Sequence, residues 1–131
     1  MPADAAAVWD IRVAPSRRLL VARAGVARTT RQRITGLLGR RGLGEHEGLV
    51  ILDCRAIHTC FMRFAIDAMF VDRAWGVVAI HHALPPWRFT WVAWKAHAVI
   101  ELPAGTVERA GIRVGDHLIV EPVQGQGGSL S

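Results

Sequence analysis

The chain has 131 residues, of which 51% are hydrophobic and 21% are charged, and its formal net charge is +5. This balance is typical of a globular domain and excludes an intrinsically disordered protein, and the length allows one hydrophobic core without a disulfide or a metal to hold it. No apolar run is long enough to span a membrane, and Asp4 and Asp10 interrupt the region where the apolar part of a secretory signal would lie. We therefore expect a single cytoplasmic domain with reduced thiols.

Arginine is concentrated near the N-terminus. Residues 12–41 contain nine arginines and no acidic residue, whereas the chain from Gly42 onward is slightly acidic. A basic surface of this kind can attract nucleic acid, anionic lipid or an acidic protein. The alternative is an ordinary solvated face, because the chain uses arginine in place of lysine almost throughout and has a single lysine, Lys95.

The first half of the chain is predicted to contain three strands and one helix. A strand at residues 17–24 precedes a short amphipathic helix at 31–39, in which apolar residues recur with helical spacing. Compact apolar runs then predict strands at 48–53 and 57–62. If 57–62 is a strand, its alternate residues point to opposite faces.

The second half is predicted to contain four strands, at 66–71, 76–84, 97–102 and 117–122. The first two form a hairpin, and a Pro-Pro pair ends its second strand because proline lacks the amide that a ladder needs. Thr106 is expected to cap a single helical turn. Turn residues separate all of these segments.

These elements favour a mainly β fold. About seven short strands at close spacing, without long crossover helices, predict a compact antiparallel sandwich or barrel that is jelly-roll-like and has one or two short helices. We expect one domain at residues 12–122, an N-terminal extension at 1–11 and a disordered tail at 123–131.

Candidate catalytic residues gather near the centre of the chain. A histidine near a cysteine can generate a thiolate nucleophile, so Cys60 with His58, or His58 with Asp67, would serve a hydrolase-like enzyme. Zinc could use Cys54, His58 and Cys60, but their spacing lacks the paired pattern of zinc sites. We therefore expect no metal, no cofactor and no catalytic residue, and a binding or accessory role instead of an enzymatic one.

Two acidic residues, Asp67 and Glu101, interrupt apolar strands. If they face inward they need partners, because an unpaired buried carboxylate is costly. Our leading hypothesis is one concave site for a polar small molecule, a sugar or a peptide end, bordered by His58, Arg63, Asp67, Trp87, Arg88 and Glu101. The alternative is structural: the two carboxylates accept hydrogen bonds from backbone amides near the turns at Gly105 or Gly115.

Two other readings concern the surface. The segment 87–94 is rich in tryptophan, and Trp87 is the best candidate for exposure because the preceding prolines force it onto a loop. An interaction module would instead dock a protein or a nucleic acid through the arginine-rich residues 12–41, although nucleic acid is the less expected partner.

Four segments, taken in their order along the chain, resemble the motifs of a known family. They are GLLGRRGLGEHEGLVI, IHTCFMRFAIDAMFVD, GVVAIHHALPPWR and AVIELPAGTVERAGIRVGDHLIV. Over residues 17–121 the chain resembles the bacterial and archaeal domain-of-unknown-function family 192 (DUF192). The resemblance implies a compact β-sandwich or jelly-roll-like domain and no established activity. The family's characteristic positions correspond to Gly36, Leu37, Arg40, Gly48, His58, Met62, Ile66, Asp67, Glu101, Gly105, Gly115 and Asp116, while Leu38 and Phe61 replace its more usual methionine and tryptophan.

Overall fold

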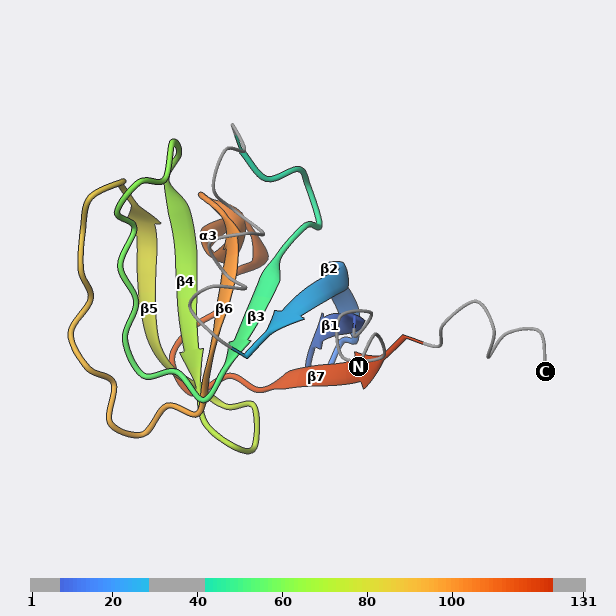
Figure 1. Cartoon of the computed structure of the whole chain (residues 1–131). Coiled ribbons are helices and arrows are strands. Elements are labelled where there is room, and N and C mark those ends of the chain that lie inside the picture. The colour runs from blue at the N-terminus through green and yellow to red at the C-terminus, as the bar shows by residue number, and fades with distance from the viewer. Residues whose placement is uncertain (1–7, 29–41, 124–131) are drawn as a thin grey trace.

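The computed structural model describes residues 8–28 and 42–123, which form seven strands and one short helix (Figure 1). In chain order these are β1 (Val8–Val13), β2 (Arg18–Ala27), β3 (Leu49–Leu52), β4 (Ile66–Val71), β5 (Val77–Leu84), β6 (Ala98–Pro103), α3 (Thr106–Ala110) and β7 (Leu118–Pro122). The predicted helix at 31–39 and the predicted tail from Gln124 onward lie outside the described residues.

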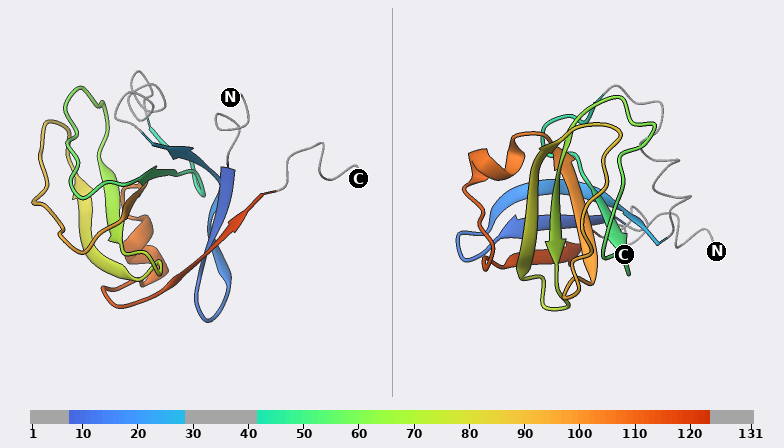
Figure 2. Two further views of the ribbon diagram at one scale, coloured as in Figure 1. Left: turned by 60° about the horizontal axis from the view of Figure 1, so that its bottom comes forward. Right: turned by 90° about the vertical axis from the view of Figure 1, so that its left-hand side faces the viewer.

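All seven strands belong to one sheet, in the order β5-β4-β6-β3-β2-β1-β7. Neighbouring strands are antiparallel except β2 and β3, which are parallel. The sheet is strongly curled and forms a half-barrel (Figure 2). The prediction of a mainly β fold is confirmed, and its specific form is one curled sheet with a short helix.

The two edge strands of the sheet, β5 and β7, approach each other at one corner. Gly76 and His117 form an isolated bridge there, and the amide of Val77 donates to the carbonyl of Asp116 at 2.8 Å. Next to this bridge the indole rings of Trp9 and Trp75 pack edge to face with their centroids 5.8 Å apart. These contacts hold the curl of the sheet closed at this corner.

The curled sheet buries apolar side chains on both faces. The concave face brings together residues from strands at opposite ends of the sheet, including Ile11, Met69 and Leu118, and α3 adds Val107 to this core. On the convex face, loops 53–65 and 85–97 cover the side chains of the central strands, such as Phe70. Strand β4 is buried along its whole length because it has a core on each side.

Six of the predicted strands are confirmed, with ends that shift by a few residues. The strand predicted at 57–62 is wrong: the amide of Met62 donates to the carbonyl of Thr59, and this tight turn ends the extended segment after one bridge, between His58 and Phe89. Strand β1 was not predicted. The helical turn near Thr106 is confirmed, but its N-cap is Gly105 in a left-handed conformation (φ 90°) and not Thr106.

Candidate functional site

Asp67 is fully buried on β4 and binds two backbone amides. Its Oδ1 atom accepts from the amide of Ala83 at 2.8 Å, and its Oδ2 atom accepts from the amide of Val107 at 2.9 Å. Val107 lies in the first turn of α3, where backbone amides lack a partner within the helix. Asp67 therefore joins β4, the end of β5 and the start of α3.

Glu101 is also fully buried, but it lies on the other face of the sheet. Asp67 is opposite Leu102 in the β4–β6 ladder, and Glu101 is opposite Ala68. Since adjacent residues of a strand point to opposite faces, Asp67 faces the concave core with Leu102, whereas Glu101 faces the convex core with Ala68. The structure does not bring these two carboxylates into one site.

The other four residues of the predicted site, His58, Arg63, Trp87 and Arg88, lie on loops 53–65 and 85–97. Backbone hydrogen bonds join the loops, including one from Thr59 to the carbonyl of Arg88 at 2.8 Å and one from Trp87 to the carbonyl of Thr59 at 3.0 Å. The buried hydroxyl of Thr59 donates to the carbonyl of Pro85 and accepts from the amide of Arg88. The two loops thus form one hydrogen-bonded unit, which we call the paired loops.

The paired loops carry most of the large apolar side chains that are exposed in the described residues. Trp91 is 88% exposed and Phe89 is 76% exposed, and the same loops expose Phe61, Trp87, Val92 and Trp94. Sequence reasoning identified the exposure of Trp87 but missed Phe61, because it placed Phe61 inside a strand. The turn at Thr59–Met62 is what directs the Phe61 ring outward.

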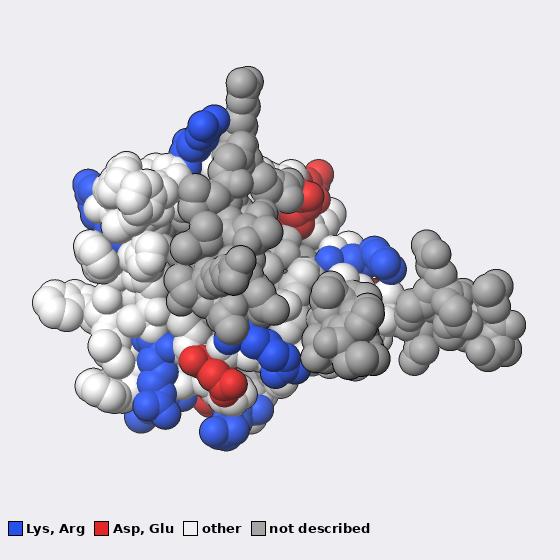
Figure 3. Space-filling model, viewed as in Figure 1, with Lys and Arg blue, Asp and Glu red and all other residues white. Residues whose placement is uncertain are grey.

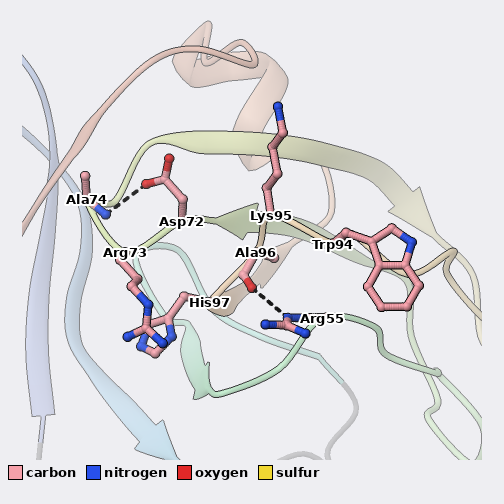
Figure 4. Close-up of a pocket in the computed structure, with 8 residues that line it drawn as sticks. All are labelled: Arg55, Asp72, Arg73, Ala74, Trp94, Lys95, Ala96 and His97. Atoms are coloured by element: carbon pink, nitrogen blue, oxygen red, sulfur yellow. Dashed lines mark hydrogen bonds between the residues drawn. The ribbon is translucent and has the colours of Figure 1, made fainter.

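A surface pocket of about 460 Å³ opens between the second of the paired loops and the β4–β5 turn (Figure 4). Its lining contains three cationic side chains, Arg55, Arg73 and Lys95, together with His97, Trp94, Asp72 and two alanines. Arg55 and His97 also line an adjoining hollow of about 280 Å³, to which Asp53 contributes. We call the two hollows together the cationic pocket.

The acidic residues of the cationic pocket already have contacts. Asp72 Oδ1 accepts from the amides of Ala74 and Gly76, both at 2.9 Å, and so holds the β4–β5 turn. Asp53 Oδ1 lies 3.7 Å from His97 Nδ1. Arg55 Nε donates to the carbonyl of Ala96 at 3.3 Å, which fixes one edge of the guanidinium (Figure 4).

Sequence reasoning singled out none of the pocket residues as a group. Arg55, Arg73 and Lys95 lie in different loops, and the sheet brings these loops together: the amide of His97 donates to the carbonyl of Val71 at 2.7 Å. The only available signal was that each cation lies two residues from the end of a predicted strand. Loop position alone does not predict which loops meet.

The Cys54 thiol and the His58 ring both make hydrogen bonds with the backbone. His58 Nδ1 accepts from the backbone amide of Cys60 at 3.2 Å, and the Cys54 thiol donates to the carbonyl of Ala56 at 3.1 Å. Within residues 8–28 and 42–123, no three His, Cys, Asp or Glu side chains are grouped so as to hold a metal ion. In these same ranges no helix combines the length and the apolar content that crossing a bilayer requires.

The fold and its surface define the class of this protein: a small β half-barrel whose loops present aromatic and cationic side chains. Residues 11–120 match the family DUF192, described as "Uncharacterized ACR", and the chain belongs to that family. The resemblance drawn from the sequence motifs is thereby confirmed.

Known proteins resemble this chain in sequence or in fold. A UPF0127 protein of Pyrococcus furiosus is 38% identical over 63 residues, which are 48% of this chain and 53% of that protein, so the match spans about half of its length. A protein of unknown function from Novosphingobium aromaticivorans has a similar crystal structure, with a TM-score of 0.73 and 27% identity over 84% of this chain and 83% of that one. A proposed transcription regulator from Sinorhizobium meliloti also gives a TM-score of 0.73, at 23% identity over 87% of this chain and 92% of that one, and this likeness concerns the fold alone.

Proposed function

We propose that this protein is a small binding domain whose cationic pocket takes an anionic group, a carboxylate or a phosphate, of a small molecule. The observation that carries the proposal is that Arg55, Arg73 and Lys95 all line one pocket. Guanidinium groups match the geometry of carboxylate and phosphate oxygens, and hydrogen bonds between charged groups are stronger than neutral ones.

The arrangement leaves donors for a ligand. Because the hydrogen bond of Arg55 to Ala96 uses Nε, its two terminal nitrogens remain directed elsewhere, and Figure 4 shows the Arg73 side chain approaching from the opposite end of the pocket. The indole of Trp94, 75% exposed at the rim, offers a flat apolar surface for the body of a ligand.

A hydrolase built on His58 and Asp67 has less support. Both carboxylate oxygens of Asp67 accept from backbone amides in the concave core, whereas His58 lies on the loops that cover the convex face. A carboxylate in that position does not orient the imidazole.

An interaction surface on the arginines of residues 12–28 also has less support. Arg12 and Arg17 both pair with Glu121, at 3.5 and 3.1 Å, and Arg18 donates to the carbonyl of Ala110 at 2.6 Å. These cations serve contacts within the half-barrel. The arginines at 31–41 lie outside the described residues.

The test is calorimetric titration of the full chain with inorganic pyrophosphate and with citrate, together with Trp fluorescence. We expect saturable binding of at least one anion, weakened about tenfold or more by Arg55→Gln or Arg73→Gln, since each removes a charge-assisted hydrogen bond. Arg113→Gln, an exposed arginine outside the pocket, is the matched control and should bind like the unmodified chain. Absence of saturation with either anion, or equal affinity in all three variants, would overturn the proposal.

A further inference from the structure

We propose that the paired loops are a docking surface for a bilayer with anionic lipid headgroups, a property separate from ligand binding in the cationic pocket. In the described residues seven large apolar side chains are exposed, and six of them lie on the paired loops; Val114 is the exception. A soluble monomer seldom gathers exposed apolar side chains in this way unless the patch binds something.

The charge of the paired loops matches an anionic surface. The paired loops contain four cations, Arg55, Arg63, Arg88 and Lys95, and one acidic residue, Asp53, at the end that borders the cationic pocket. In Figure 3, uncharged side chains project on the side where β5 and the paired loops lie, and blue cationic groups stand at the margins of that region. Trp and Phe favour the boundary between headgroups and acyl chains, and nearby Lys and Arg bind the headgroups.

The rings are held outward by the backbone and do not depend on a partner for their position. Phe61 (φ 71°) and Trp87 (φ 64°) adopt left-handed backbone conformations that bulky residues rarely occupy. Their rings contact each other at a centroid distance of 4.7 Å. Such conformations persist where the surrounding structure imposes them, here through the hydrogen bonds of Thr59.

A bilayer suits this surface better than a single-stranded nucleic acid. The Phe61 and Trp87 planes are tilted by 58°, and Phe89 is tilted by 49° against His58, so these rings pack on one another and do not form parallel shelves for bases. Val92, which cannot stack, is exposed among them. Apolar side chains at loop tips can enter the interfacial layer of a membrane together.

The test is co-sedimentation of the full chain with vesicles of equal parts phosphatidylglycerol and phosphatidylcholine, and with phosphatidylcholine alone. We expect binding to the anionic vesicles, a blue shift of Trp emission, and loss of binding in high salt. The double variant Phe89→Ala/Trp91→Ala should lower partitioning about tenfold or more, and Arg63→Gln or Arg88→Gln about fivefold each.

Val114→Ala, which removes an exposed apolar side chain outside the paired loops, is the matched control and should bind like the unmodified chain. No binding to anionic vesicles at low salt, or equal binding of the double variant and Val114→Ala, would overturn the inference. So would preferential binding of poly(U) that the double variant loses. Neither Phe89 nor Trp91 lines the cationic pocket, so pyrophosphate binding should survive the double variant, and the two proposals can fail separately.

Discussion

Replacing Asp67 with asparagine removes a carboxylate while keeping the shape of the side chain. In the folded protein both oxygens accept from backbone amides, one at the end of β5 and one in the first turn of α3. An amide side chain has one acceptor oxygen and one NH₂ group. Asp67→Asn therefore places a donor against one of two backbone donors in a fully buried position.

The cost follows from these contacts. A hydrogen bond to a charged group is worth about 1.5–3 kcal/mol, and a buried donor left without an acceptor costs about 1–3 kcal/mol. Asp67→Asn weakens one bond and abolishes the other, so we expect the free energy of unfolding to fall by about 2–4 kcal/mol. Asp67→Ala, which abolishes both, should cost about 3–5 kcal/mol.

Urea unfolding followed by Trp fluorescence measures this loss. The control is Asp116→Asn, which changes the same side chain where its Oδ2 atom accepts from the amide of Arg113 in an exposed turn. Water can replace that bond, so the control should lose less than about 1 kcal/mol. Equal losses at the two positions, or a loss below about 1 kcal/mol at Asp67, would refute the structural role assigned to this carboxylate.

Three further predictions concern packing, loop support and pH. Gly48→Ala should lower the free energy of unfolding by about 1–3 kcal/mol, because a Cβ at Gly48 would stand 3.1 Å from three neighbours, among them a backbone carbonyl oxygen. Gly42→Ala, where a Cβ meets nothing within 4 Å, is its control in the same urea unfolding assay. Thr59→Val keeps the side-chain shape but removes the hydroxyl that joins the paired loops, and should cost about 1–3 kcal/mol and speed hydrogen exchange of the loop amides. Burial beside Phe70 lowers the pKa of His81, so the unfolded chain binds a proton more readily than the folded one. The contribution of His81 to the free energy of unfolding should therefore be fully present above the ordinary histidine pKa. It should decline as the pH falls through that value toward the lower pKa of the folded state. His81→Gln should make the urea midpoint depend less on pH between about pH 8 and pH 5. An unchanged pH profile in His81→Gln would contradict this assignment.

The strands that sequence reasoning found are those in which apolar residues and turn signals agree. Strands β4 and β6 are short, mainly apolar segments bounded by turns, each with a single acidic residue, and both are central in the sheet. Strand β1 was missed although Trp9, Ile11 and Val13 alternate with the charged residues Asp10 and Arg12, as in a half-buried strand. In the structure Asp10 Oδ1 accepts from the amide of Arg23 at 2.8 Å, where the β1–β2 register shifts. The Asp10 carboxylate therefore accepts a backbone hydrogen bond at an irregularity of the ladder, and the local sequence does not predict this contact.

The candidate site was harder to predict because it depends on which face of the sheet a side chain occupies. Sequence alone identified Asp67 and Glu101 as unusual, and it left open a structural role near Gly105. The bond from Val107, two residues beyond Gly105, is of that kind. The register that places Asp67 and Glu101 on opposite faces, and the meeting of Arg55 with Arg73, arise only when the sheet is assembled.

The residues that carry the family resemblance explain the fold, but they do not explain what the surface binds. Met62, Ile66, Asp67 and Glu101 are buried, and Gly48 packs closely against the backbone of Glu101. Membership of the family therefore accounts for the half-barrel, and the proposed surfaces must be tested on residues other than these characteristic positions.

The two proposed surfaces share one support, which gives a test that neither offers alone. The carbonyl of Arg55 accepts from the amide of Ala93 at 2.8 Å, so the backbone ladder that presents the rings of the paired loops also positions one wall of the cationic pocket. Loosening the ladder with Thr59→Val should weaken pyrophosphate binding and vesicle binding together. Arg73→Gln should weaken mainly pyrophosphate binding, and Phe89→Ala/Trp91→Ala should weaken only vesicle binding. If Thr59→Val instead leaves both affinities unchanged while the loop amides exchange faster, the ladder does not set the geometry of either surface, and each must be held by its own side-chain packing.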